Sequence, residues 1–472
     1  MKKILVAAAV MACFGTAGAA EDLTVDIAVI GAGGAGMSAA VQANELGAKV
    51  VLVEKMAMVG GNTIRAAGGL NATETALQKA KGSKDSVEIM YFDTMKGGHW
   101  LNDPALVRTL AEKSASTVDW LLAHGGDLRD VGLMAGASFA RTHRPTGGAL
   151  VGPEVVRTLY TSAKAQNIDI RTNTKATEIL KDKAGRVVGI KVQGKDGAYT
   201  IHAKAVIDAA GGFGANNAMV SKYVPRLKGF ATTNHPGATG DGLQIAEKIG
   251  ANLIQMDQIQ THPTVVPNVG EMITEAVRGN GAVLINKEGK RFYNELETRD
   301  NVSAAILKQK DGLAYLFFDS DMQKSLKATN KYIKQPYCLN GATLDEIAGK
   351  MNVPAADLKA TMEAWKKGKA ANKDAFGRAD MPRDLDKGPF YAIAVTPAVH
   401  HTMGGIKIDP LTQVYDVKGK VIPGFFAAGE VTGGVHGGNR LGGNAQSDIV
   451  TFGRIAGQQA FIYVRQLDAQ KK

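Results

Sequence analysis

Three clusters of polar residues, far apart in the sequence, carry the side chains with the most evident chemistry. They are residues 261–264 (THPT); residues 272–278 (MITEAVR), with Arg299 downstream; and the pair His400–His401, with Arg440 closer to the C-terminus. An arginine guanidinium is a planar fork that pairs with a carboxylate through two hydrogen bonds. A fold that brings these clusters together would suit a small dicarboxylate.

Each cluster taken alone also has a structural interpretation. A single histidine is more often a hydrogen-bonded structural residue than a ligand-binding one. Arg278 and Arg299 are equally suited to be ion-pair partners of Glu275 and Asp300. The residue types therefore leave both interpretations open.

The segment 26–55 has the pattern of a βαβ dinucleotide-binding unit. Apolar runs at 27–30 and 50–53 predict buried parallel strands, with a helical pattern between them. Three glycines at GxGxxG spacing open this helix: Gly31, Gly33 and Gly36. Such glycines admit a pyrophosphate and let the helix pack on the strand. Glu54 is placed to accept hydrogen bonds from ribose hydroxyls, which disfavours NADP and leaves FAD or NAD.

The rest of the chain predicts further strands and helices around a charge-dense insert. Strand patterns occur at 168–171, 176–180, 186–193, 199–203 and 205–210, and the first four suggest a meander. The composition shifts from about residue 257 to about residue 396, which predicts an inserted second domain. The run 421–430 predicts another buried strand. A final amphipathic helix has this inner stripe: Ile449, Val450, Phe452, Ile455, Phe461 and Val464.

Composition and the N-terminus restrict the class of protein. The chain has 472 residues, of which 45% are hydrophobic and 21% charged, as in a globular protein of two or three domains. Lys2 and Lys3, an apolar run over 4–14 and small residues at 17–19 predict a cleaved signal peptide. No stretch approaches the ~20 apolar residues of a membrane span. The net charge of +11 comes without a basic run, which disfavours a nucleic-acid partner.

The two cysteines exclude several cofactors and cross-links. Cys13 lies in the predicted signal peptide, so the mature chain retains only Cys338 and has no internal disulfide. The sequence contains no CxxCH motif for a c-type haem and no cysteine cluster for an iron–sulfur centre.

Four long motifs resemble a known family. MITEAVRGNG, NELETRDNVSAAIL, PAVHHTMGG and AAGEVTGGVHGGNRLGGNAQSDIVTFGRIAG are similar to the flavoprotein of soluble periplasmic fumarate reductases of the flavocytochrome c type. These are related to the flavoprotein subunit of succinate dehydrogenase. The resemblance implies an α/β fold with an α+β insert: a Rossmann-type FAD-binding domain with a capping domain. The expected division is 1–20 signal peptide, 21–256 and 397–472 FAD-binding domain, and 257–396 capping domain.

The resemblance also implies a clamp on each end of the substrate. Arg440 and His400 match the residues that hold one carboxylate, and His262 and Thr274 match those that hold the other. Met272 matches a residue that presses on the substrate and helps to twist it.

Proton transfer is implied for a second set of residues. Arg299 looks like the general acid, and Glu275 and Arg278 look like the relay that resupplies its proton. Glu275 is also expected to contact the substrate.

The resemblance further implies a set of cofactor contacts. The expected FAD contacts are Gly31, Ala32, Gly33, Gly34, Ala35, Gly36, Glu54, Lys55, Asn62, Thr63, Ala67, Gly68, Gly69, Gly211, Asp241, His401, Glu430, Arg440, Gly443, Asn444, Ala445 and Ile449. A sodium site is expected at Thr402, Met403, Gly404, Glu430 and Thr432. Membrane-bound relatives attach FAD through a histidine in the region matched by 62–69, and no histidine occurs there, so FAD is expected to bind non-covalently.

The sequence departs from the flavocytochromes in lacking a haem domain. Electrons are therefore expected from a separate periplasmic c-type cytochrome. Relatives reduce urocanate, methacrylate or cinnamates, and the retained His262 favours a substrate with two carboxylates. Methacrylate or acrylate is the main alternative substrate. A flavin electron-transfer protein without turnover is the alternative class.

Overall fold

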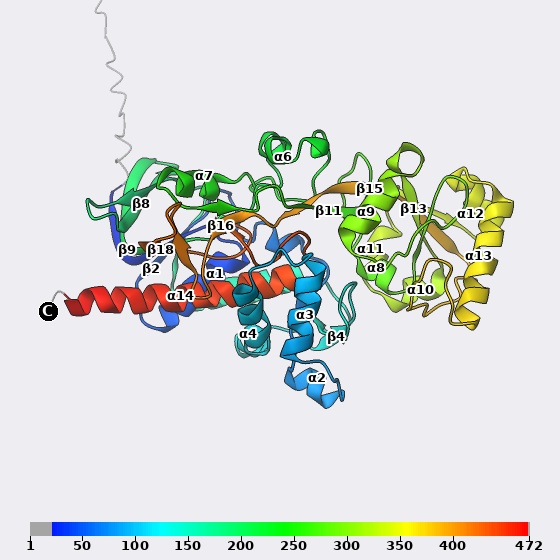
Figure 1. Ribbon diagram of the computed structural model, residues 1–472, viewed down its shortest axis with the longest axis horizontal. Helices are drawn as coiled ribbons and strands as arrows, with labels where there is room; N and C mark the ends of the chain where they lie inside the picture. Colours follow the sequence, from blue (N-terminus) through cyan, green and yellow to red (C-terminus); the bar gives the residue numbers. More distant parts are fainter. Residues whose placement is uncertain (1–20, 471–472) are drawn as a thin grey trace, which may run out of the picture.

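The computed structural model describes residues 21–470, which form two lobes (Figure 1). The predicted signal peptide lies outside the described residues. One lobe contains the N-terminal βαβ unit and the C-terminal helix, and the other is formed by the middle of the chain. Each lobe has its own hydrophobic cluster, and the second cluster takes its residues from 266 to 395.

The first lobe is built on an eight-stranded sheet with a parallel centre. Its order is β17-β18-β9-β1-β2-β6, and β8 and β7 continue antiparallel from β9. The bounds are β1 Leu23–Ile30, β2 Val50–Val53, β6 Asp169–Arg171, β7 Lys175–Lys181, β8 Val187–Gly194, β9 Gly197–Asp208, β17 Gln413–Tyr415 and β18 Val421–Ala427. The apolar runs of β1 and β2 are buried, as is typical of parallel strands covered on both faces.

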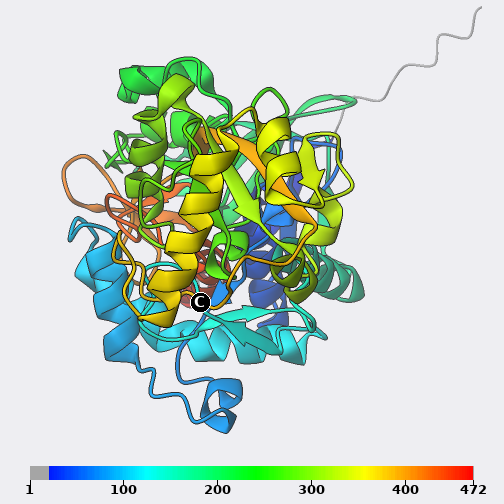
Figure 2. The same ribbon diagram turned by 90° about the vertical axis from the view of Figure 1, so that its right-hand side faces the viewer.

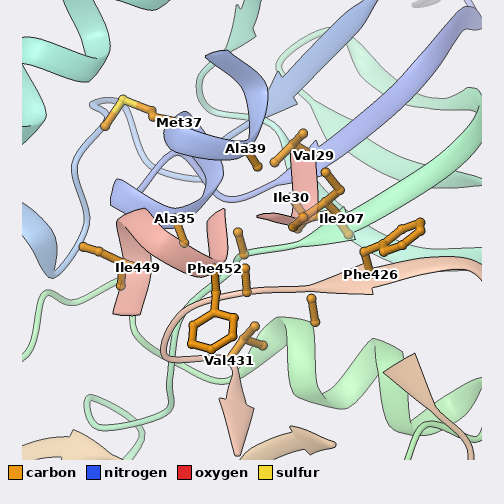
Figure 3. Packing of buried hydrophobic residues seen from close by; sticks show 14 of the residues in the cluster. Val29, Ile30, Ala35, Met37, Ala39, Ile207, Phe426, Val431, Ile449 and Phe452 are labelled. Atoms are coloured by element: carbon orange, nitrogen blue, oxygen red, sulfur yellow. The ribbon is translucent and has the colours of Figure 1, made fainter. Parts of the chain in front are cut away.

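Helices α1 (Gly34–Glu45) and α14 (Asn444–Gln470) pack closely against each other. A Cβ atom at Gly453 would lie 2.5 Å from the carbonyl oxygen of Ala35, so this approach requires a glycine. Figure 3 shows Ala35 facing Ile449 and Phe452 of α14. The contact fixes the C-terminal helix against the nucleotide-binding unit.

Smaller elements complete the first lobe. They are β3 Leu70–Asn71, β4 Asp130–Gly132, β5 Thr142–Arg144, β10 Leu253–Ile254, β16 Gly405–Lys407, β19 Thr432–Gly433, α2 Ala76–Ala80, α3 Val87–Gly97, α4 Pro104–Ala123, α5 Val151–Ala165, α6 Asn217–Tyr223 and α7 Asp241–Lys248. Short 3₁₀ turns occupy Thr63–Arg65 and Pro225–Leu227. Among residues 21–470, no helix combines the length and apolar character needed to cross a membrane.

The second lobe has a five-stranded antiparallel sheet covered by short helices. Figure 2 looks onto this lobe, with α13 in yellow in front. The strands are β11 Ile259–Val265, β12 Val283–Ile285, β13 Ala314–Phe318, β14 Cys338–Gly341 and β15 Phe390–Thr402. The helices are α8 Ala276–Gly279, α9 Arg299–Leu307, α10 Ser320–Ser325, α11 Thr329–Tyr332, α12 Leu344–Met351 and α13 Ala355–Ala370, with a 3₁₀ turn at Lys310–Gly312.

Strand β15 joins the lobes. Its first residues pair with β13 and β14, and its last residues pair with β11. The strand ends at His400, His401 and Thr402, so it carries two histidines to the junction. The predicted domain boundary at residue 396 falls inside this strand, and the domain limits stay a prediction.

Two predictions about elements were wrong. The patterns at 199–203 and 205–210 belong to one strand, β9, which pairs with both β8 and β1. The pattern at 168–171 is not part of a meander, because β6 pairs in parallel with β2. The predicted inner stripe of α14 is confirmed: Ile449, Val450, Phe452 and Val464 are buried in the core, and Ile455 and Phe461 are half-buried and pack against it.

Candidate active site

A cavity of about 890 Å³ lies between the lobes and extends from the glycine turn of the βαβ unit to the second lobe. The predicted substrate and proton-transfer residues that line it are His262, Met272, Thr274, Glu275, Arg299, His400 and Arg440. Arg278 does not line the cavity and lies behind Glu275, with Nη2 at 3.8 Å from Glu275 Oε2. Residues as far apart in the sequence as His262 and Arg440 therefore meet in one wall.

Most predicted FAD contacts line the same cavity. They are Gly31, Gly33, Gly34, Ala35, Glu54, Lys55, Asn62, Thr63, Ala67, Gly68, Gly69, Gly211, Asp241, His401, Glu430, Arg440, Gly443, Ala445 and Ile449. Ala32, Gly36 and Asn444 do not line it. Gly36 packs under the turn, because a Cβ atom there would lie 1.8 Å from the carbonyl oxygen of Gly31. Asn444 is buried and hydrogen-bonded to Asn71 and Thr94.

The cavity walls fit FAD at the glycine turn. Gly31 has a φ of +95°, and a Cβ atom there would lie 2.6 Å from the carbonyl oxygen of Ala209. Helix α1 begins without a side-chain cap and without an acidic residue in its first turn, so its positive end is left for an anion. A Cβ atom at Gly211 would meet no other atom within 4 Å, which leaves open space beside the turn.

Glu54 closes this end of the cavity. Its Oε2 accepts a hydrogen bond from Ala32 N at 2.9 Å, and its Oε1 accepts one from Met56 N at 2.8 Å. These bonds hold the carboxylate at the end of β2, where a ribose contact is predicted. That contact stays a prediction.

Arg299 and Glu275 form a buried ion pair at the other end. Arg299 begins α9, and its Nε donates to Glu275 Oε2 at 2.5 Å. Both side chains are less than a tenth exposed. Arg278 Nη1 donates to the carbonyl oxygen of Glu295 at 2.6 Å. A chain of charged groups therefore runs from the cavity into the second lobe.

The charges and burial in this wall keep Glu275 ionised and lower the pKa of the nearby Arg278 and Arg440. Burial raises the pKa of Glu275, but Arg299 and Arg278 outweigh it and hold that pKa below the usual 4.5. Burial lowers the pKa of Arg278 to about 10 and that of Arg440 to about 9. Since both values stay above neutrality, Arg278 and Arg440 remain charged at pH 7.

Gln260 is a site residue that the sequence did not predict. Its Oε1 accepts hydrogen bonds from Arg299 Nη1 at 3.3 Å and from Arg440 Nη2 at 3.0 Å. Its amide nitrogen donates to Asn439 Oδ1 and to the carbonyl oxygen of Arg440. The side-chain amide of Gln260 therefore bridges Arg299 and Arg440, the two arginines that line the cavity.

Two histidines lie next to each other in the same wall. The ring centroids of His262 and His400 are 5.0 Å apart. Burial, reinforced by nearby arginines, lowers the pKa of both well below 6.5, so both are neutral at pH 7. His262 Nε2 is buried and has no hydrogen-bond partner among the described residues. An unpaired buried N–H or lone pair in a cavity wall indicates a ligand-binding position.

Thr274 and Met272 lie on the segment that precedes α8, and both line the cavity. The backbone N–H of Thr274 donates to the hydroxyl of Tyr332 at 3.2 Å. Tyr332 also lines the cavity, and burial raises its pKa to about 12. The sequence did not predict Tyr332, because a tyrosine in a helical segment has no local signature of a site residue.

Glu430 and His401 lie on the cofactor side of the cavity, where Glu430 is half-buried and His401 is buried. Burial raises the pKa of Glu430, whose carboxylate accepts from Asn62 Nδ2 at 3.1 Å and from Thr402 N at 3.1 Å. His401 packs edge-on against His436 with centroids 5.2 Å apart. Thr402, Met403, Gly404 and Thr432 do not line the cavity, and the sodium site stays a prediction.

Comparisons with known proteins identify the family. Residues 26–445 match the family described as the FAD binding domain. The chain is 53% identical over 442 residues to a fumarate reductase (cytochrome) of Shewanella frigidimarina, covering 93% of this chain and 77% of that protein. It is 40% identical over 463 residues to a urocanate reductase of Eggerthella lenta, covering 94% of this chain and 76% of the relative.

A solved structure has the same architecture. The open conformation of a flavocytochrome c3 fumarate reductase matches with a TM-score of 0.80 at 45% identity, covering 95% of this chain and 79% of that one. The predicted fold class is therefore confirmed. The pattern of the βαβ unit allowed either FAD or NAD, and the family match identifies FAD as the cofactor. The chain belongs to the FAD binding domain family, as a flavoprotein of the flavocytochrome c fumarate reductase group, and is an FAD-dependent oxidoreductase.

Proposed function

We propose that the protein is a periplasmic fumarate reductase that binds FAD non-covalently and receives electrons from a separate c-type cytochrome. The observation that carries this proposal is the convergence of Arg299, Arg440, His262 and His400 on one end of a cavity whose other end is the FAD-binding turn. Cationic and N–H donors placed in this way suit a small anion with a carboxylate at each end.

Substrate binding is assigned to the two sides of the wall. Arg440 and His400 hold one carboxylate, and His262 and Thr274 hold the other. Met272 presses on the carbon chain between them. Binding both ends fixes the alkene in one orientation, which converts a random encounter into a pre-aligned reaction. The positive charge of the arginines stabilises negative charge that develops beside a carboxylate.

Bound FAD, when reduced, supplies the hydride that adds to one alkene carbon. Arg299 donates a proton to the neighbouring carbon, and the product is the saturated dicarboxylate. An arginine is a weak acid, because its usual pKa is above about 12. Proton donation therefore requires a site closed to water, and a relay that returns a proton to Arg299 at once. Glu275, at 2.5 Å from Arg299 Nε, is the nearest member of that relay: its carboxylate takes up a proton from the side of Arg278, which stands behind it, and passes the proton to the deprotonated Arg299.

Methacrylate or acrylate is the main alternative substrate. Methacrylate reductases also pair a flavoprotein with a separate cytochrome, which is the electron donor proposed here. A substrate with one carboxylate would leave His262 and Thr274 without an anion to bind. We therefore propose fumarate first.

The proposal includes a periplasmic location, non-covalent FAD and a bound sodium ion. The predicted signal peptide supports export to the periplasm, and the lack of histidine at 62–69 supports non-covalent FAD. Sodium bound at Thr402, Met403, Gly404, Glu430 and Thr432 stays part of the proposal.

Oxidation of a reduced viologen dye by the purified, FAD-loaded protein tests the function. Fumarate, methacrylate, acrylate, urocanate and cinnamate are supplied in parallel. Fumarate is expected to give the highest kcat/KM. Faster turnover with a monocarboxylate would replace fumarate by that substrate. If none of these acceptors supports oxidation of the dye, a flavin electron-transfer protein without turnover would be favoured.

A further inference from the structure

The neutral histidines of the cavity wall raise a question of tautomers. A neutral imidazole carries one N–H donor and one lone pair, and its two nitrogens exchange these roles between tautomers. To donate to a substrate carboxylate, each ring must carry its hydrogen on the nitrogen that faces the cavity. The partner of the other nitrogen decides this.

His262 is held in one tautomer by the backbone. Its Nδ1 is 3.3 Å from the backbone nitrogen of Thr264, which can only donate. The lone pair is therefore on Nδ1, and the hydrogen is on Nε2. This is the buried nitrogen that has no partner among the described residues.

His400 has a hydroxyl in the corresponding place. Its Nδ1 is 2.6 Å from Oγ1 of Thr233, which precedes it by 167 residues in the chain. The other acceptor open to this hydroxyl is the carbonyl oxygen of Val399, at 3.4 Å. That carbonyl already accepts the backbone N–H of Thr233 at 2.9 Å. If Nδ1 donated instead, the hydroxyl hydrogen would be left with this distant carbonyl, which already accepts another hydrogen bond, and the lone pair of Nε2 would face an anionic ligand. Donation from the hydroxyl to Nδ1 avoids both costs.

We propose that Thr233 is a positioning residue, which donates its hydroxyl hydrogen to Nδ1 of His400 and so holds the hydrogen of that ring on Nε2. Together with the Thr264 backbone, it makes both histidines uncharged N–H donors toward one anionic ligand. This inference deepens the proposed function and rests on it for the identity of the ligand. The geometry that supports it involves no ligand.

Nitrogen NMR of the FAD-loaded protein with ¹⁵N-labelled histidine tests the tautomer directly. His400→Gln assigns the signals of His400. We expect an unprotonated Nδ1 and a protonated Nε2 in the wild type, and a mixture of tautomers in Thr233→Val. A protonated Nδ1 in the wild type, or an unchanged pattern in Thr233→Val, would overturn the inference.

Binding of succinate, the reaction product, tests the consequence without turnover. The dissociation constant is measured from the change in flavin absorbance of the oxidised protein. Thr233→Val should weaken binding about tenfold, the usual effect of losing one well-made hydrogen bond to a charged network. Thr233→Ser should restore it to within about twofold. Unchanged binding in Thr233→Val would count against the proposed role.

A matched control separates this role from a general loss of stability. Thr117 has a buried hydroxyl that is 2.7 Å from Oγ1 of Thr451, away from the cavity. Thr117→Val should lower the melting temperature and leave the succinate constant unchanged. If the wild type neither binds succinate nor reduces fumarate, the proposed function fails, while the NMR result still decides the tautomer.

Discussion

Replacing Arg299 by alanine tests the proton-transfer role. Its guanidinium contacts Glu275 at 2.5 Å and Gln260 at 3.3 Å, and both Arg299 and Glu275 line the cavity. A positioned general acid contributes about 10²–10⁴-fold to a rate. The loss of a preorganised cation at the reacting carbon adds about 10²-fold or more. We expect kcat to fall by about 10⁴-fold, or about 5.4 kcal/mol at about 1.36 kcal/mol per factor of ten.

The same substitution has a cost in stability that must be separated from the cost in rate. Removing one partner of a buried ion pair costs about 3–5 kcal/mol. Arg141 is a matched control, because it is equally buried, pairs with Asp85 and Asp93 at 2.8 and 2.7 Å, and does not line the cavity. Arg141→Ala should destabilise the protein comparably and keep kcat within about threefold.

Viologen oxidation with fumarate, FAD content by absorbance and melting temperature are measured for both variants. Arg299→Ala is expected to retain FAD, because its side chain contacts the wall opposite the glycine turn. Turnover within tenfold of the wild type, in a variant that is folded and loaded with FAD, would remove Arg299 from the role of acid.

Three further predictions concern the cofactor side and the buried charges. Gly36→Ala should abolish FAD retention, because the added Cβ atom would lie 1.8 Å from the carbonyl oxygen of Gly31. Gly349→Ala in α12 is the control: its Cβ atom would meet no other atom within 4 Å, so FAD content and melting temperature should stay unchanged. Glu430→Gln should weaken FAD binding by about tenfold in a fluorescence titration, because it removes the negative charge and replaces one of the two oxygens that accept from Asn62 and Thr402 with an NH2 donor; unchanged affinity would exclude a role in binding. The pKa of His401 is lowered by burial and nearby cations, so the unfolded chain binds a proton near pH 6.5 that the folded protein does not. The free energy of unfolding should therefore fall as pH drops below 6.5, by up to about 1.36 kcal/mol per pH unit for this histidine, and the melting temperature of His401→Asn should fall less steeply; an equal slope would contradict the shift.

The nucleotide-binding unit could be predicted because its signals are local. Strand 50–53 was predicted to the residue, since an apolar run flanked by polar residues determines it. The glycines predicted the turn before α1, because φ values above zero and close contacts exclude other residues there. By contrast, the single strand β9 was predicted as two, because its pairing partners change along its length.

The candidate site could be predicted only in part. The arginines and histidines stand out by residue type, and the structure brings them into one cavity wall. Gln260, Thr233 and Tyr332 were missed, because their roles depend on partners up to 180 residues away. Strand β15 was also missed, although it carries His400 to the junction of the lobes. Polar residues whose roles depend on long-range hydrogen bonds have no sequence signature of their own.

Stopped-flow reoxidation of the reduced, FAD-loaded protein tests the central claim most directly, because it needs neither a cytochrome nor a dye. Flavin absorbance is followed after mixing with fumarate or with methacrylate at equal concentration. Fumarate is expected to reoxidise the flavin at least about 100-fold faster, since a second carboxylate engages His262 and Thr274 in charge-assisted hydrogen bonds. Equal rates, or no reoxidation by fumarate, would contradict a site built to hold a carboxylate at each end.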